Sequence, residues 1–491
     1  MSTHPTPTPA TSEPPPSPKR WFGLIGMGLG IFMFTLDGSI VNVALPTLVN
    51  AFGTTFATVQ WVVLVYLLII TTLGLGAGRV GDLYGRKRVY LVGLGIFTTA
   101  SLLCGLSPGV HWLIACRALQ GLGAVFVSAL GAAIIAQTFP ANERGRALGV
   151  IGSSVTLGVA LGPSVGGLII ALAGWRWMFL VNIPVGIAAM TVVARLIPDL
   201  HTTPAKVRFD WIGLLLFAAS LGCLSFALNW GQRLGFATAP VLGLFGLAAG
   251  SFVLLLYIER RVPGPILDLR MFADRSFSLG LLSSTLVFVV VGGTGFIMPF
   301  FLELVLGYPI AKVGLLMAIS PVLGGFMAPI GGTFADRFGP RGVSLIGACV
   351  LMLGCFLLAT LDETTNTLRF ALCVAPMGLG MGLFSAANNT SVLNAVPRER
   401  LGTGSAMLSL ARTLGQSTGV PLVAALFGVI ALGHAGGASH ETLLGLPPAS
   451  LVHGVRASFA AAGGIALLAV AAGLWRLSAR QTASGGRSGT P

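Results

Sequence analysis

Three ionisable side chains, Asp37, Arg117 and Arg412, stand inside long apolar stretches of this 491-residue sequence. A charge held at the middle of a bilayer costs about 2.5–3.5 kcal/mol on insertion scales, so a residue that persists there is a candidate for function. A buried carboxyl group can alternate between a neutral and a charged form, which is the chemistry of proton binding and release. The sequence therefore directs attention first to Asp37.

Asp37 lies well inside the first apolar stretch, in the segment Leu36–Pro46. It is either a proton-coupling carboxyl or a permanently ion-paired residue that fixes helix packing. Arg117 needs a partner if it is buried, and Asp37 is the best deep acid for it, although a substrate or a backbone carbonyl could also serve. Gln120 follows Arg117 by three residues and so shares its helix face.

Other polar residues on the apolar stretches are predicted to line a substrate cavity. Arg412 is either an interhelical hydrogen-bond anchor or a substrate contact. Glu303 ends its stretch near the outer surface, where it is either solvated or faces the cavity and favours cationic cargo. The predicted cavity residues are Asn42, Gln120, Glu303, Arg412 and Gln416.

Composition indicates the elements that must position these side chains. The chain is 54% hydrophobic and only 9% charged, whereas soluble domains are about one quarter charged. Fourteen apolar runs of roughly 20 residues or more follow one another, each long enough to cross a bilayer as a helix. The runs lack the alternating pattern of a β-barrel wall. We therefore predict an all-α polytopic membrane protein.

The basic residues predict the orientation of these spans. The net charge of +14 would indicate nucleic-acid binding in a soluble protein, but most of the 29 basic residues lie in short loops on one side of the predicted membrane. That asymmetry predicts a cytoplasmic location for both termini. The proline-rich segment 1–20 is predicted to be a disordered tail, and the run that follows it to be a retained span.

Two loops repeat one pattern. Gly78, Asp82 and Gly85 follow the second span, and the glycines and acid at positions 332, 336 and 339 follow the tenth span with the same spacing. Spans 1–6 and 9–14 therefore read as two copies of a six-span unit with two helices inserted between them, an architecture of rocking transporters. The predicted divisions are 1–20, 21–198, 199–276, 277–477 and 478–491.

The repeated loops and the fifth span are the candidate moving parts. Each loop acid can pair with a neighbouring base, as in Asp82 with Arg86 or Asp336 with Arg337, and so latch the cytoplasmic ends of the halves. Alternatively, the basic residues only anchor to anionic lipid. The fifth span carries close-packing glycines and a proline that predicts a bend, suited either to a pivot or to tight packing alone. These residues are Gly158, Gly162, Pro163 and Gly166.

These segments together resemble the major facilitator superfamily, and more narrowly its fourteen-span drug:proton antiporters. The resemblance runs from about residue 21 to residue 477. It is carried by five segments in the expected order, with the stretch 378–421 also similar: Leu36–Pro46, Gly78–Arg88, Arg117–Gly123, Gly158–Gly167 and Trp175–Gly186. It implies two six-helix bundles plus two inserted helices, with Asp37 and Arg117 in proton coupling. Leu83 departs from the family pattern, which often has a base there, and Glu303 stands where a glutamine is expected.

The resemblance implies a proton-coupled antiporter that exports small lipophilic compounds from the cytoplasm. A dedicated exporter of one metabolite and a proton symporter for uptake remain alternatives. We find no catalytic motif, no metal motif and no phosphate loop, so we predict neither an enzyme nor a cofactor, with the proton gradient as the energy source. The expected location is a bacterial cytoplasmic membrane, and the expected state is a monomer in the lipid bilayer without nucleic acid.

Overall fold

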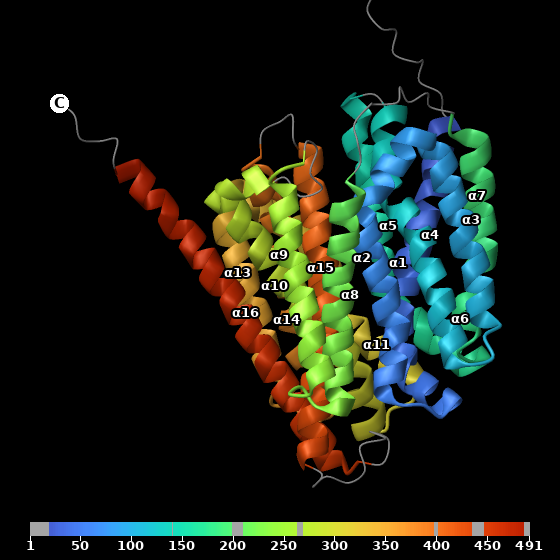
Figure 1. The fold of residues 1–491 in the computed structure, drawn as a ribbon, viewed down its shortest axis with the longest axis vertical. Coiled ribbons are helices and arrows are strands. Elements are labelled where there is room, and N and C mark those ends of the chain that lie inside the picture. The colour runs from blue at the N-terminus through green and yellow to red at the C-terminus, as the bar shows by residue number, and fades with distance from the viewer. Residues whose placement is uncertain are drawn as a thin grey trace, which may run out of the picture.

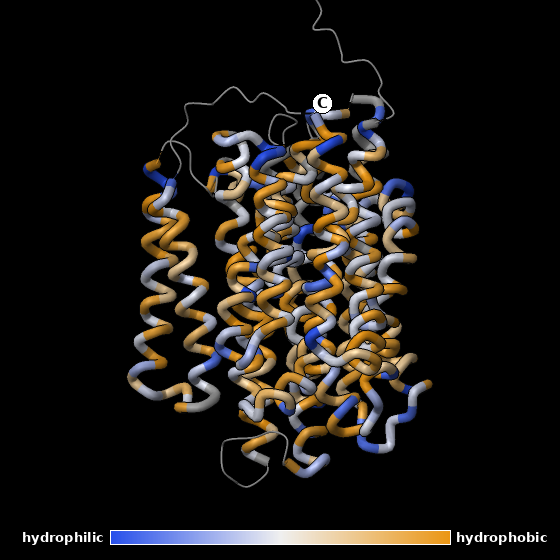
Figure 2. The backbone as a smooth tube through the Cα atoms, turned by 90° about the vertical axis from the view of Figure 1, so that its right-hand side faces the viewer, coloured by the Kyte–Doolittle hydropathy of each residue, from blue (hydrophilic) through white to orange (hydrophobic). Residues whose placement is uncertain are grey.

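The computed structural model describes residues 19–139, 141–198, 210–262, 269–396, 401–434 and 446–485. These residues form helices and short connections. Fourteen of the helical segments are long and apolar enough to cross a membrane, as the sequence predicts. Figure 2 shows apolar residues along most of the helix lengths and hydrophilic residues gathered mainly near the two ends. The predicted tail falls largely within 1–18, outside the described residues.

The first six spans form one bundle (Figure 1), in which α1 packs on α5 and α7, and α4 packs on α2 and α3. The sixth span is broken at Val181 into two helices. The helices of this half are α1 (Lys19–Phe52), α2 (Phe56–Tyr84), α3 (Arg86–Gly105), α4 (Val110–Thr138), α5 (Ala141–Ala173), α6 (Trp177–Leu180) and α7 (Asn182–Leu196).

Two further helices, α8 (Trp211–Leu234) and α9 (Ala239–Glu259), pack on each other between the two halves in sequence. The carboxylate of Asp210 caps α8 by accepting a hydrogen bond from the backbone amide of Gly213 at 2.8 Å. Of this pair, α8 is the helix that contacts both bundles, through α2 and α15.

The last six spans form the second bundle. The ninth span ends in a π-helical turn, and the tenth is broken at Ala318. The elements of this half are the short 3₁₀ turn η1 (Leu269–Ala273), α10 (Arg275–Phe300), the π-helical turn η2 (Phe301–Val305), α11 (Ile310–Met317), α12 (Ile319–Phe338), α13 (Pro340–Leu358), α14 (Thr367–Leu393), α15 (Leu401–His434) and α16 (Pro448–Gly485).

The two repeated loops have the same backbone geometry. Gly85 is the single residue between α2 and α3, and Gly339 is the single residue between α12 and α13. Their φ angles are +95° and +89°, a region that side chains with a Cβ rarely adopt. Glycine at these positions lets each helix pair reverse direction over one residue.

The two bundles meet at the end of the molecule that the predicted orientation places outside. We call this the outer end, and the end with the repeated loops the inner end. Phe56 at the start of α2 contacts Phe296 and Phe300 of α10, with ring centroids 5.2 and 4.8 Å apart. Phe427 of α15 approaches the same ring at 5.8 Å. This aromatic cluster closes the outer end between the halves.

Candidate functional site

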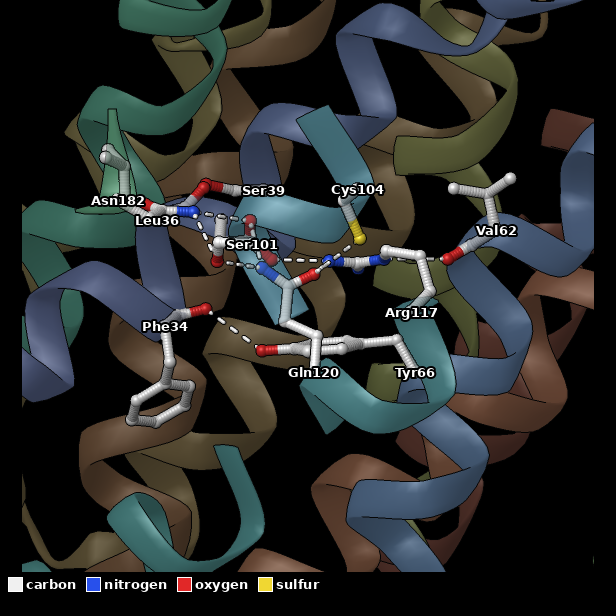
Figure 3. A network of polar contacts seen from close by, with 11 residues as sticks. Phe34, Leu36, Ser39, Val62, Tyr66, Ser101, Cys104, Arg117, Gln120 and Asn182 are labelled. Carbon is white, nitrogen blue, oxygen red and sulfur yellow. Dashed lines mark hydrogen bonds and ion pairs between the residues drawn. The ribbon is translucent and has the colours of Figure 1, made fainter. Parts of the chain in front are cut away.

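Asp37 is the centre of a buried polar network inside the first bundle. Figure 3 shows its partners Arg117, Gln120 and Asn182. Its Oδ2 accepts a hydrogen bond from Nη1 of Arg117 in α4, at 2.5 Å, as part of an ion pair. Its Oδ1 accepts from Nε2 of Gln120 at 3.0 Å and from Nδ2 of Asn182 at 2.9 Å. The carboxylate of α1 thus holds donors from α4 and α7, and the predicted pairing of Arg117 with Asp37 is present.

Arg117 is held from several sides. Its Nε donates to the carbonyl of Val62 at 3.0 Å, and its Nη1 also donates to Oε1 of Gln120 at 2.7 Å. The guanidinium lies 4.0 Å from the centroid of the Tyr66 ring, a cation–π distance. These contacts hold the guanidinium group of Arg117 in position independently of its ion pair with Asp37.

The network is sealed from solvent. Asp37 and Gln120 are 0% exposed, and Arg117 and Asn182 are each 1% exposed. Ser101 of α3 accepts hydrogen bonds from Gln120 and Asn182 at 2.7 and 3.4 Å. A buried charge pair contributes to stability only when its remaining hydrogen-bonding groups are satisfied, and here they largely are.

Glycines let the helices approach closely enough to form the network. A Cβ added to Gly121 would lie 3.1 Å from the side chain of Ile69 in α2. A Cβ on Gly123 would lie 2.5 Å from the backbone nitrogen of Phe97 in α3. Both glycines follow Arg117 on α4, so the same segment supplies the charge and the close packing that buries it.

The predicted glycine face of α5 packs against the helix that carries Asp37. A Cβ added to Gly158 would clash with Thr35, and one added to Gly162 would clash with Ser39. A Cβ added to Gly166 would lie 2.6 Å from the side chain of Ile40. Ser39 donates a hydrogen bond to the carbonyl of Gly158 at 3.2 Å. The close-packing partner of this face is therefore α1.

The opposite side of α5 contacts the second bundle at the outer end. A Cβ added to Gly314 of α11 would clash with the carbonyl oxygen of Pro163. A Cβ added to Gly167 would lie 2.6 Å from the carbonyl oxygen of Ile310, the first residue of α11. Ser164 donates to the carbonyl of Gly314 at 3.4 Å. One helix thus links the surroundings of Asp37 to the other half.

The inner-end loops are well separated from this contact. Arg86 donates to the carbonyl of Ala133 in α4 at 3.4 Å. Asp336 and Arg337 are exposed, and Asp336 makes no ion pair with any residue that the structure describes. The side chain of Asp82 lies outside the described part of the chain. No neighbour within 4 Å would limit a Cβ at Gly78. The predicted latch stays a prediction.

The other predicted cavity residues do not join the Asp37 network. Asn42 and Gln416 are half-buried and Arg412 is exposed, and their side chains form no hydrogen bond with another described residue. Glu303 lies in the π-helical turn, with its Oε2 shielded from solvent and without a hydrogen-bond partner among the described residues. Gln120, by contrast, is wholly taken up by the network around the ion pair.

Sequence reasoning missed three participants: Asn182, Ser101 and Tyr66. Asn182 opens α7 directly after the break at Val181. A single polar residue in an apolar run was the available signal, but such a residue does not reveal which helix it faces. Across the described residues, no three His, Cys, Asp or Glu side chains gather as a metal site requires.

A family model of the Major Facilitator Superfamily matches residues 27–420 and again residues 281–491. The chain belongs to the Major Facilitator Superfamily. The expected fold and family are therefore confirmed, and the superfamily and its named relatives indicate a transporter and not an enzyme.

Named relatives within the superfamily differ in what they are said to carry. The riboflavin transporter RibZ of Clostridioides difficile is 33% identical over 83% of this chain and 88% of its own length. The multidrug resistance protein Stp of Mycobacterium tuberculosis is 35% identical over 81% of this chain and 74% of its own length. A probable actinorhodin transporter of Streptomyces coelicolor is 32% identical over 86% and 75%.

A solved structure has the same fold at low sequence identity. It is a bacterial homologue of the human lysosomal transporter Spinster in an inward-facing, unoccupied conformation, with a TM-score of 0.67 and 18% identity. The alignment covers 94% of this chain and 97% of that one.

Proposed function

We propose that this transporter is a proton-coupled antiporter that exports small lipophilic compounds from the cytoplasm. The observation that carries the proposal is the sealed network in which Asp37 receives three donors, from Arg117, Gln120 and Asn182. A single proton on this carboxyl would cancel the charge that holds them. The energetic consequence is large because the group is fully buried.

The geometry around Asp37 supports a specific coupling step. When Asp37 is charged, its carboxylate binds α1 to α4 and α7. When it is protonated, the attraction to Arg117 is lost, whereas Arg117 keeps its bonds to Val62 and Gln120. Protonation therefore mainly releases α1, because Asp37 lies on that helix. The glycines of α5 pack against the same helix.

Transmission to the second half would use α5. This helix contacts α1 on one side and α11 on the other, so a shift of α1 is passed to the outer-end contact between Pro163 and Gly314. In the proposed cycle, Asp37 is charged while cargo loads from the cytoplasm. Protonation from the outside then favours release of the cargo. The inner-end loops would latch in the outward-open state.

A dedicated exporter of one metabolite is the second candidate. It is favoured by the relative that is named as a riboflavin transporter, which stands beside relatives that are named for multidrug resistance. Both candidates use the same Asp37 machinery and differ only in the cavity. Uptake by proton symport is a third possibility, which the direction of transport distinguishes.

The orientation and location of the chain belong to the same proposal. The concentration of basic residues in the inner-end loops supports cytoplasmic termini and a bacterial inner membrane. A monomer driven by the proton gradient, without a cofactor, is the simplest form consistent with two bundles in one chain.

The test uses everted membrane vesicles with an acid interior and a fluorescent reporter of the pH gradient. Candidate lipophilic compounds are added to vesicles that contain the wild type, Asp37→Asn, or Glu363→Gln as a matched control in an exposed loop. Antiport is supported if compounds discharge the gradient through the wild type and the control but not through Asp37→Asn.

Two other outcomes are decisive. If the wild type and Asp37→Asn respond alike, Asp37 is structural and the coupling assignment fails. If a broad panel of drugs and dyes gives no response but one metabolite such as riboflavin does, the dedicated exporter replaces the multidrug proposal.

A further inference from the structure

Two cavities lie along the contact between the inserted helix α8 and the first bundle. The larger has a volume of about 530 Å³ and is lined by residues of α2, α4 and α8. The smaller, of about 250 Å³, is lined by the same three helices closer to the inner end. Figure 1 shows α8 lying beside α2. We call these two cavities together the α2–α8 seam.

The seam follows almost the full thickness of a membrane. Its lining residues run along α2 from residue 57 to residue 83. At a rise of 1.5 Å per residue this is about 39 Å, close to the roughly 40–45 Å of a bilayer with its headgroup regions. Trp61 and Trp230 line the outer cavity and Trp211 lines the inner one. Tryptophan is enriched at the membrane–water interface.

The seam opens sideways. Phe226 and Trp230 are 42% and 44% exposed at the outer cavity, and Trp211 is 60% exposed at the inner one. In a chain with fourteen membrane spans, a side opening at these depths faces the bilayer. The occupant is therefore drawn from the membrane phase and not from the cytoplasm.

The walls of the two cavities are mostly apolar. Most lining residues are aliphatic, aromatic or glycine. The polar atoms of Thr72 and Asn229 are already engaged, because Thr72 donates to the carbonyl of Leu68 at 2.7 Å and Asn229 donates to that of Ala57 at 2.9 Å. His111, near the start of α4, also lines the outer cavity, whereas the inner cavity is lined by apolar side chains, glycine and the ring of Trp211. An unfilled apolar cavity forfeits the dispersion contacts of its lining.

We propose that the α2–α8 seam is a phospholipid site in which acyl chains, one from each leaflet, fill the two cavities. Phospholipid is the most abundant apolar molecule at these openings, so mass action favours it over any cargo. The bound chains complete the contact between α8 and α2, which near the outer end includes hydrogen bonds from Asn229 to Ala57 and Gln60. The inference does not depend on proton coupling.

Gly222 allows the outer cavity to be filled without disturbing the helix. It lines that cavity, and no heavy atom lies within 4 Å of the position that its Cβ would occupy. Gly243 of α9 has the same open surroundings but lines neither cavity. Gly222→Phe and Gly243→Phe are therefore a matched pair that differ only in whether the added ring enters the seam.

The experiment counts phospholipids on the purified protein by native mass spectrometry, at a detergent concentration that strips loosely bound lipid. We expect the wild type and Gly243→Phe to retain the same number of phospholipid molecules, and Gly222→Phe to retain about one fewer. Ala218→Leu, a smaller change in the same wall, guards against misfolding of the first variant.

A second measurement adds phosphatidylethanolamine and phosphatidylglycerol back to delipidated protein and follows the melting temperature. A smaller gain for Gly222→Phe than for Gly243→Phe supports the site. Equal lipid counts and equal gains in all variants overturn it. A changed affinity for a lipophilic dye with an unchanged lipid count also overturns it, because the seam would then belong to the cargo.

Discussion

Asn182, the first residue of α7, donates a hydrogen bond from Nδ2 to Oδ1 of Asp37 in α1 at 2.9 Å. The sixth span is broken just before this residue, so the start of a new helix is positioned at the buried charge. Among the described residues, Gln120 is the other donor to the same oxygen. Asn182 thus supplies one of the two hydrogen bonds to Oδ1.

Replacing Asn182 by leucine, which has a similar size, should slow proton-coupled transport by roughly 10- to 100-fold. A hydrogen bond to a charged group contributes about 1.5–3 kcal/mol, and each 1.4 kcal/mol is a factor of ten. The rate of gradient discharge in everted vesicles measures the effect. Thr191→Val is the control on the same helix, since its exposed hydroxyl bonds only the carbonyl of Ile187. An unchanged rate in Asn182→Leu would remove Asn182 from the coupling site.

Arg117→Met should destabilise the protein by about 3–5 kcal/mol, because it leaves the charge of Asp37 buried without its partner. The double variant with Asp37→Asn should recover much of that loss, since neither charge then remains. Thermal unfolding of the purified protein gives both values. If the loss of stability in the double variant equals the sum of the losses in the two single variants, the pair is not energetically coupled.

Gly314→Val should prevent the outer ends of α5 and α11 from meeting, because even one added carbon clashes with the carbonyl of Pro163. Nitroxide labels at Ala51 and Pro309, on opposite halves, should report a longer distance in this variant than in the unmodified protein. Gly332→Val is the control, since its surroundings are open. Equal distances in both variants would mean that the outer end closes by another contact.

Glu303→Gln should lower the transport of monovalent cationic cargo relative to neutral cargo of similar size, because it removes the negative charge that is predicted to line the cavity. The shielded Oε2 in the π-helical turn motivates this expectation. The ratio of the two transport rates is compared with that of Glu363→Gln, which changes an exposed loop acid. An unchanged ratio assigns Glu303 a structural role at the end of the ninth span.

The loop between α13 and α14 should show a pH-dependent contribution to stability. Hydrogen bonds from Thr364, and then from Arg369 and Thr365, lower the pKa of Asp362 from 3.8 to about 2. Since the folded pKa lies below the unfolded one, the ionised form stabilises the fold. The contribution is fully present above about pH 4 and is lost as the pH falls toward 2.

Asp362→Asn measures this contribution. The group is partly exposed, and exposed ion pairs contribute about 0–1 kcal/mol, so the difference in melting temperature from the wild type should be small at pH 5. It should shrink further as the pH is lowered to 2. A difference that grows on acidification would reverse the assigned sign.

Most of the fold could be predicted from the sequence because apolar runs long enough to cross a bilayer leave few alternatives. The breaks at Val181 and Ala318 could not, since one residue does not interrupt an apolar run. The spacing of Gly158, Gly162 and Gly166 indicates a close-packing face. It does not identify α1 as the partner, because that depends on the packing of all the helices.

The candidate site was likewise predictable from the sequence only in part. Asp37 and Arg117 are recognisable because charges in apolar runs are rare and need partners. Ser101 and Asn182 are not, since neutral polar residues occur in many spans and can bond to their own helix. Their inclusion in the network depends on the direction in which α3 and α7 present them.

Among the described residues, every side chain that hydrogen-bonds to the carboxyl group of Asp37 comes from the first bundle. On the proposed function, the proton-binding part of the molecule is therefore modular with respect to the half of the chain that follows the inserted helices. Variation in the second half would then alter cargo choice without redesign of the proton chemistry. Hybrid proteins that join residues 1–198 of this chain to the later segments of a relative should keep their response to the proton gradient and acquire the cargo of that relative. Loss of that response in well-folded hybrids would show that the later segments also take part in coupling.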